Sequence, residues 1–396
     1  MTALNSGQGR RLPLPLFLVA LLLIALNLRV GIVVIGPLAN GMGEELALSG
    51  GALGLLTTLP LLCFGALSIF SPRFAERWGL ETVLLTALWL LFLGLVLRLF
   101  GSYFWLLAGT VLLGAAIAVM NVLIPSLVRS RFPHKVAALT ALYSVIMTLG
   151  AASAAGVAVP VRDAFGGDWR YPLAGCALVA LAGAIGWCFM LPYRTPAASG
   201  KAPSLGLWRN PRAWVFSVFF GLQSLLYYSL TAWLATVFVD AGMSEARAGE
   251  LLTLFNLSGM PANFCAPLFF ARMRNRRLAM VLLHVPLLIS VPALMIAPTS
   301  QPVLWVVLLG LGQGSMISTG LTLIALRGAD ARAAAGLSGL CQSVGYLLAA
   351  LGPVTLGLLH DAAGNWRIPL MLLSALLLVQ FVAAVLSADG EPIGLH

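Results

Sequence analysis

Charged residues are scarce in this chain of 396 residues, where Asp, Glu, Lys and Arg together make up only 9%. Soluble domains contain about 25% of these residues. Hydrophobic residues instead account for 60% of the chain, and its mean hydropathy is +0.98. This composition excludes a soluble globular protein and predicts a protein that crosses a membrane many times.

Sequence signals of catalysis and metal binding are missing as well. The chain has no Gly-x-Ser-x-Gly elbow, no phosphate-binding loop and no metal-ligand spacing. Its five cysteines all lie in apolar segments, where we interpret them as small buried hydrophobic residues. We therefore expect no enzymatic activity and no cofactor.

Twelve apolar segments are long enough to cross a bilayer as helices, which takes roughly 20 residues each. The predicted spans are 14–40, 51–71, 81–100, 103–128, 136–161, 170–192, 213–239, 247–270, 278–298, 302–326, 333–359 and 367–387. The first follows Arg10 and Arg11 as a signal peptide does, but it is too long for one, so we expect an uncleaved first span. The predicted fold class is an all-α membrane protein with twelve transmembrane helices.

One stretch of sequence occurs twice, about half the chain apart. Gly167–Leu173 reads GDWRYPL, and Gly364–Leu370 reads GNWRIPL, a shift of 364 − 167 = 197 residues. So long a repeat predicts two homologous membrane halves, a common plan of secondary transporters, with the substrate site between them. We interpret the repeated Trp-Arg-x-Pro motif itself as structural.

The repeat also predicts how the chain is divided. We expect residues 1–192 to form one six-helix bundle and residues 213–396 the other, with the proline-containing segment 193–212 as a short cytoplasmic linker.

Basic residues are distributed unevenly between the two sides of this topology. Of the 23 Lys and Arg, Arg29 lies inside a span and seventeen lie on the side of the N-terminus. The five on the other side are Arg98, Arg162, Arg170, Arg247 and Arg367. The asymmetry predicts cytoplasmic termini. The net charge of +10 therefore reflects topology, and we expect a lipid bilayer and a small molecule as partners, no nucleic acid, and a functional monomer.

Two six-helix halves in parallel repeat, with both termini inside, resemble the major facilitator superfamily. The loop between the second and third spans supports this, because Glu76, Arg77 and Gly79 keep an acid-Arg-x-Gly core of that family's loop motif. In a transporter of this kind, Glu76 and Arg77 are candidates for gating. Gly345 and Pro353 are further candidates, because they permit close helix contact and bending.

Longer blocks carry a closer resemblance: Ala25–Arg29, Leu55–Leu62, Tyr227–Leu234, Gln342–Ala350 and His360–Trp366. These blocks resemble the bacterial cyanate and 2-nitroimidazole transporter family, and more closely its nitroimidazole branch. The resemblance implies transport of a small anion or a nitro-heterocycle, with the two bundles opening alternately to each side.

Arg29 is the strongest candidate for contact with a substrate. An arginine in the middle of a bilayer costs ~2.5–3.5 kcal/mol on insertion scales, so its guanidinium must face a wet cavity or a partner. Its planar fork suits a carboxylate, cyanate or nitro group. No Asp or Glu is predicted mid-membrane, which favours an anionic or strongly polarised substrate over a cation. The alternative is a structural arginine bonded to backbone carbonyls.

In the resembled fold, spans 1, 4, 7 and 10 line a central cavity and spans 2, 5, 8 and 11 flank it. The polar and aromatic candidates on these spans are Asn121, Tyr143, Gln223, Tyr227, Tyr228, Gln313, Gln342 and Tyr346. Amides and phenols can bond a small polar ligand, and aromatic faces can stack on a heterocycle. For each residue alone, the alternative is a hydrogen bond between helices. We expect His284, on a peripheral span, to be a packed residue.

Two other functions remain open from the sequence. A broad exporter of drugs or metabolites would accept many unrelated substrates and depend little on Arg29. A sensor with a transporter fold would bind a ligand without moving it.

Overall fold

The computed structural model describes residues 13–68, 70–132, 135–193, 208–327 and 331–388. Within these ranges the chain forms helices and no strands. The α-helices are α1 (Leu14–Val33), α2 (Ile35–Leu46), α3 (Gly50–Leu67), α4 (Ser71–Trp78), α5 (Leu80–Leu97), α6 (Tyr103–Arg131), α7 (Val136–Ala164), α8 (Arg170–Cys188), α9 (Pro211–Asp240), α10 (Glu245–Arg272), α11 (Arg276–Ile296), α12 (Pro302–Arg327), α13 (Ala331–Ala363) and α14 (Arg367–Ala388).

Each predicted span corresponds to a helix, and the first corresponds to two, α1 and α2. Eleven of the spans in the described ranges are long and apolar enough to cross a membrane. The other predicted span, α10, has 28 residues and packs against α12 and α7. Its interior contains Asn256, Ser258 and Asn263, which make it less apolar. The twelve-helix prediction therefore agrees with the packing.

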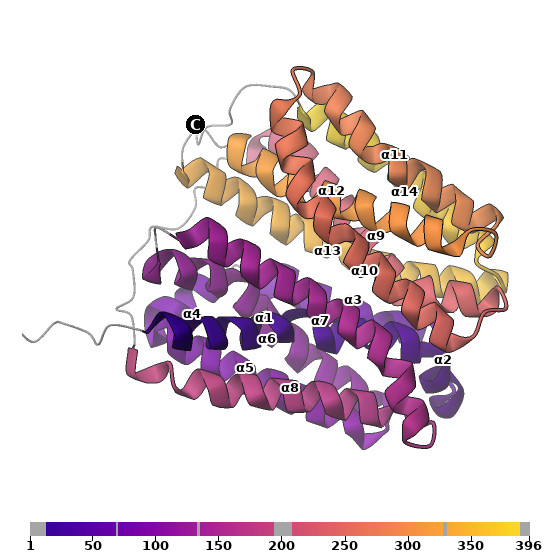
Figure 1. Ribbon diagram of the computed structural model, residues 1–396, viewed down its shortest axis with the longest axis horizontal. Coiled ribbons are helices and arrows are strands. Elements are labelled where there is room, and N and C mark those ends of the chain that lie inside the picture. Colours follow the sequence, from indigo (N-terminus) through magenta and orange to yellow (C-terminus); the bar gives the residue numbers. More distant parts are fainter. Residues whose placement is uncertain (1–12, 69, 133–134, 194–207, 328–330, 389–396) are drawn as a thin grey trace, which may run out of the picture.

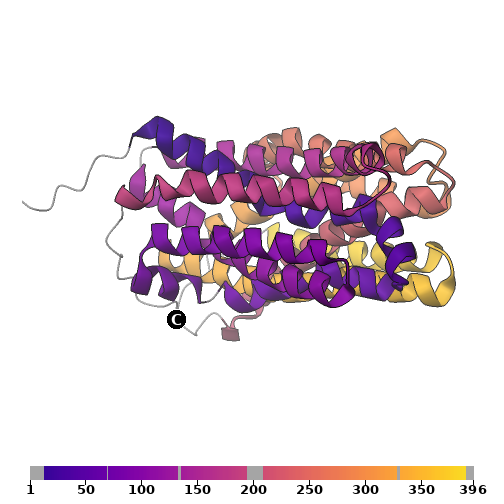
Figure 2. The same ribbon diagram turned by 90° about the horizontal axis from the view of Figure 1, so that it is seen from below.

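The long helices run side by side along the molecule (Figures 1 and 2). Helices α1 to α8 occupy the lower part of Figure 1, and α9 to α14 occupy the upper part. Between these two groups, α3 packs along α13, α7 along α10, and α2 against α9. We call the end of the bundle where α2 ends and α3 begins the distal end, because α1 begins and α14 ends at the other end (Figure 1).

The first span is broken at Val34, between α1 and α2. Pro37 explains the break, since it has no N–H to donate to the carbonyl one turn earlier. Near the break, the buried Arg98 donates from Nη1 to the Gly31 carbonyl over 2.6 Å. A Cβ at Gly36 would lie 2.6 Å from the carbonyl oxygen of Thr231, so this glycine lets α2 approach the backbone of α9.

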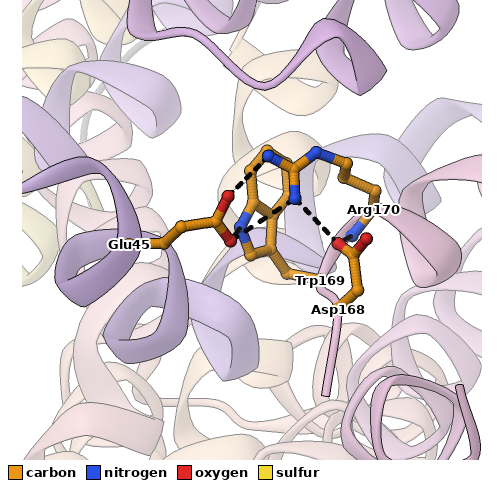
Figure 3. Close-up of polar contacts among 4 residues, drawn as sticks. All are labelled: Glu45, Asp168, Trp169 and Arg170. Carbon is orange, nitrogen blue, oxygen red and sulfur yellow. Dashed lines mark hydrogen bonds and ion pairs between the residues drawn. The ribbon is translucent and has the colours of Figure 1, made fainter. Parts of the chain in front are cut away.

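At the distal end, the two copies of the repeated motif make the same contact (Figure 3 shows the first). The Trp169 indole donates to Glu45 at the end of α2, with Nε1 to Oε2 at 2.7 Å. The Trp366 indole donates to Asp240 at the end of α9, with Nε1 to Oδ2 also at 2.7 Å. In both groups of helices, the motif thus ties the start of the last span to the distal end of the first.

Candidate functional site

Arg29 lies at the centre of the 33-residue span Leu14–Leu46 and faces a cavity of about 80 Å³. The cavity is formed where α1 and α7 meet α9, α10 and α12. Its polar lining comes from Arg29, Thr148, Gln223, Tyr227, Asn256, Asn263 and Gln313. The remaining lining consists of Met147, Ala151, Phe255, Gly259, Gly310, Gly314 and Ile317. The site is therefore a small, mostly neutral chamber containing one cation.

Two tyrosines of α9 hold the Arg29 guanidinium. Arg29 donates from Nη1 to the hydroxyl of the buried Tyr228. Its Cζ lies 5.3 Å from the Tyr228 ring centroid and 5.6 Å from that of Tyr227, within the range of cation–π attraction. Among the residues that the structure describes, no carboxylate lies within 4.0 Å of Arg29. The positive charge is held in place without being neutralised.

Amide side chains from three helices meet beside Arg29. Gln223 donates from Nε2 to Gln313 Oε1 over 3.3 Å, which links α9 to α12. The Tyr227 hydroxyl donates to Asn256 Oδ1 over 3.1 Å, which links α9 to α10. Gln223 and Tyr227 are one helical turn apart, so they share the face of α9 that lines the cavity.

Two polar atoms of this lining lack a partner within the described ranges. They are Gln313 Nε2 and Asn263 Oδ1, and both atoms are buried. A buried polar atom without a hydrogen bond costs about 1–3 kcal/mol, so a ligand that bonds these two atoms would recover that free energy. The cavity therefore has unused capacity both to donate and to accept.

Two further predicted tyrosines lie close to this site but outside the cavity lining. Tyr346 packs edge-on against Phe64 and against Tyr228, with ring centroids 5.4 and 6.5 Å apart. Tyr143 is half-buried on α7, one turn before the lining residue Met147. Tyr346 thus continues the aromatic surroundings of Arg29 from α9 onto α13.

The predicted amides Gln342 and Asn121 also lie outside the cavity lining. Gln342 donates from Nε2 to the Ser338 hydroxyl one turn earlier, over 2.9 Å. Asn121 is half-buried on α6.

The predicted gating residues lie in several places. Pro353 accepts a hydrogen bond from Trp233 Nε1 over 2.8 Å, and its carbonyl would lie 2.7 Å from a Cβ at Gly54 of α3. Gly345 faces Phe220, whose ring would lie 2.7 Å from an added Cβ.

Arg77 is exposed, with Cζ 5.4 Å from the Trp78 ring centroid, and the side chain of Glu76 lies outside the described residues. His284 is buried on α11, where Nδ1 bonds the Met280 carbonyl at 2.8 Å, and it does not line the cavity.

Sequence reasoning missed Asn256 and Asn263 as cavity residues. They are seven residues apart, which is two helical turns and places them on one face of α10. Two amides at this spacing in an apolar helix are a usable signal of a polar face. Within the described ranges, no cluster of three or more His, Cys, Asp or Glu side chains is placed to hold a metal ion.

The family profile and the named relatives that match this chain all describe membrane transporters. The family profile described as Major Facilitator Superfamily matches residues 17–353. The chain is 37% identical over 392 residues to the 2-nitroimidazole transporter of Escherichia coli, covering 98% of both chains. It is 28% identical to the cyanate transport protein CynX of the same organism, covering 88% of this chain and 91% of the other. A bacterial homologue of the human lysosomal transporter Spinster, solved in an inward-facing and occupied conformation, has the same fold, with a TM-score of 0.78, 18% identity, and coverage of 94% and 96%.

Proposed function

Since this chain belongs to the Major Facilitator Superfamily, we propose that it moves a small planar anion or a nitro-heterocycle across the membrane by alternating access. Like the other members of its family and its named relatives, it is a membrane transporter and not an enzyme. The observation that carries the choice of substrate is the Arg29 guanidinium, held in the cavity by neutral phenols with no carboxylate beside it among the described residues.

The chemistry of Arg29 favours a planar, negatively polarised group. A guanidinium has five N–H donors in a rigid fork and binds two oxygens of one planar group side by side. Arg29 uses one nitrogen, Nη1, to bond Tyr228. The other donors remain for a ligand, and in a site of low polarity such bonds are stronger than in water.

Aromatic rings next to the guanidinium suit a flat heterocycle. Tyr227 and Phe255 both line the cavity, with ring centroids 6.0 Å apart and planes 29° apart. A flat ring can stack on such faces. The names of the 2-nitroimidazole and cyanate relatives agree with both kinds of substrate.

Alternating access is supported by where the two groups of helices touch. At the distal end, Asp361 of α13 accepts from the backbone N–H groups of Gly50 and Gly51 of α3, over 2.8 and 2.9 Å. Arg162 of α7 also pairs there with Glu245 of α10, Nη1 to Oε2 at 2.5 Å. These polar contacts would break and re-form as the bundles 1–192 and 213–396, joined by the linker 193–212, rock around the central site.

The excess of Lys and Arg on the side of the membrane where both termini lie supports cytoplasmic termini, and the named bacterial relatives support an inner membrane location. In this arrangement the distal end faces the outside. We propose that a single chain is the functional unit, because the cavity is built within it.

Flux through proteoliposomes tests the proposal. Labelled cyanate and 2-nitroimidazole would be offered to wild type, Arg29→Lys and Arg29→Gln. Hydrogen bonds to charged groups are worth about 1.5–3 kcal/mol, so Arg29→Gln should weaken apparent affinity roughly 10- to 150-fold. Arg29→Lys should fall between, because it keeps the charge and loses the fork.

Arg247→Gln is the matched control, since Arg247 is an exposed residue of α10 paired only with Glu250 in the described structure, and such surface pairs contribute little. Flux of lipophilic cations that is indifferent to Arg29 would favour the broad exporter. Ligand-dependent stabilisation without any flux would favour the sensor.

A further inference from the structure

The cavity contains two recognition elements of different chemistry. One is the Arg29 cation on α1, and the other is a set of neutral amides on α9, α10 and α12. The proposed function uses only the first. The amides therefore need an account of their own.

Existing bonds already occupy part of the amide set. Asn256 accepts from Tyr227 and donates from Nδ2 to the Leu252 carbonyl over 2.9 Å, so its contacts lie within the protein. Gln313 is 3% exposed, and its Oε1 accepts from Gln223. What is left is the N–H₂ group of Gln313 and the carbonyl oxygen of Asn263, which have no partner in the described part of the chain.

Glycines bring the two helices that carry these atoms close together. Gly259 of α10 and Gly310 and Gly314 of α12 all line the same cavity. A Cβ at Gly314 would lie 2.3 Å from the Gly259 carbonyl oxygen, and a Cβ at Gly310 would lie 2.3 Å from that of Phe255, so these glycines let α10 pack closely on α12. Asn263 and Gln313 therefore line the cavity from two closely packed helices.

We infer that the substrate carries a neutral edge with one hydrogen-bond acceptor and one donor, which Gln313 and Asn263 recognise while Arg29 binds its anionic or nitro group. This inference rests on the proposed function. An azole ring, with one bare nitrogen and one N–H, has this edge. A bare triatomic anion such as cyanate has no N–H donor and leaves Asn263 unsatisfied.

The most direct test compares the binding of 2-nitroimidazole with that of 1-methyl-2-nitroimidazole, which lacks the N–H and keeps the nitro group. Dissociation constants would be measured with the purified full chain, from the rise in melting temperature with ligand concentration. Wild type should bind the N–H form at least tenfold more tightly, because a site built to bond a donor rejects the analogue without it.

Gln313→Leu and Asn263→Leu remove each amide and keep a side chain of similar size. Each should weaken 2-nitroimidazole about tenfold. Asn263→Leu should change the methylated analogue less than threefold and so abolish the preference, because that analogue has no N–H for Asn263 to accept. Gln313→Leu should weaken both analogues, because both keep the bare nitrogen to which Gln313 donates. Gln313→Leu also breaks the bond to Gln223, whereas Asn263→Leu does not, so a loss of preference in Asn263→Leu is free of that side effect. Gln301→Leu is the control, an exposed residue away from the cavity. Gln313→Met serves as a second variant if Gln313→Leu does not fold.

The outcomes separate the two proposals. Equal losses for both analogues in Asn263→Leu, or unchanged binding of 2-nitroimidazole in Gln313→Leu, would overturn this inference, with the role of Arg29 intact. Binding of cyanate or nitrate but neither azole would also overturn it and leave the proposed function standing. If wild type binds no anion and no nitro compound, the proposed function itself fails.

Discussion

The groups that surround a buried cation in a membrane protein decide whether it can attract an anionic ligand. A carboxylate beside Arg29 would neutralise the guanidinium and compete with an anionic substrate. The Tyr228 phenol orients it through one hydrogen bond and leaves its charge in place. Phenols are therefore suitable partners for an arginine that must attract a negatively polarised ligand.

Tyr228→Phe should weaken substrate binding without abolishing it. The ring of Tyr228 is 3% exposed and would stay packed, whereas the hydroxyl that accepts from Arg29 would be lost. A typical net hydrogen bond is worth about 0.5–1.5 kcal/mol, so we expect a rise in KM of roughly 2- to 12-fold with a smaller change in maximal flux. Concentration-dependent flux measures both.

Tyr171→Phe is the control for that change, because Tyr171 is an exposed residue stacked on Phe165 and is not part of the cavity lining. An unchanged KM in Tyr228→Phe would mean that the ring alone orients Arg29, and that the hydroxyl is dispensable.

The site was only partly predictable from residues. Arg29 stands out by its charge in an apolar span, and Gln223 and Tyr227 by their one-turn spacing, and all three line the cavity. Gln342 has the same spacing to Tyr346, but its amide turns back to Ser338 on its own helix. Spacing decides which face of a helix a residue occupies. Its rotamer depends on which nearby group its side chain bonds, and spacing does not show this.

Among the elements, the long helices could be read from apolar length, while the break at Val34 was missed. Its signal, Pro37 inside the first span, was present in the sequence. The short helix α4 lies within a predicted loop, where apolar length gives no indication. What remained unpredictable was which helices would pack together, because that depends on contacts between distant segments.

The N-terminus of α3 makes a polar contact across the distal end. Asp361 places a carboxylate against the first N–H groups of that helix, where the helix dipole favours negative charge. The bond joins α13 to α3, and so joins the two groups of helices. We therefore expect closure of this end during transport to depend on a charge acting on a helix terminus.

Asp361→Asn should open the distal end more often. The variant keeps one acceptor oxygen and loses the charge and the second oxygen, which should cost about 1–2 kcal/mol of the closed state. Spin labels on Glu44→Cys and Ala362→Cys, both exposed near this end, report its width once the other cysteines are replaced. We expect the distance distribution to shift to longer values.

Asp168→Asn is the matched control, because its carboxylate bonds only Arg170 in the described structure, on the same side of the interface. An identical distribution in Asp361→Asn and Asp168→Asn would show that apolar packing between α3 and α13 closes this end without help from the charge.

At the scale of the whole molecule, the repeat is matched by repeated contacts. Asp168 accepts from the Arg170 N–H, and Asn365 accepts from the Arg367 N–H in the same way. The predicted membership of the superfamily, and the resemblance to its nitroimidazole and cyanate transporters, are confirmed by the family profile and the named relatives. The sequence repeat therefore predicted a transporter fold, whereas composition alone predicted only that the chain crosses a membrane many times.

The two halves differ where the repeated tryptophans meet their acids. Glu45 bonds Trp169 and also pairs with Arg170, Nη2 to Oε1 at 2.5 Å. Asp240 bonds Trp366, and its other described partner is His360, at 3.3 Å, which attracts it fully only when protonated. Losing the indole therefore leaves Glu45 better satisfied than Asp240.

Trp169→Phe and Trp366→Phe should both lower the melting temperature, and Trp366→Phe should lower it more. Each loses a hydrogen bond to a charged group, worth about 1.5–3 kcal/mol, and only Glu45 keeps an arginine partner. Since the two contacts share no residue, the losses should add in the double variant. Thermal unfolding of the purified protein measures all three. A double variant that loses much less than the sum would mean that one half already unfolds when the other is weakened, and the two bundles could not then act as independent rigid units in transport.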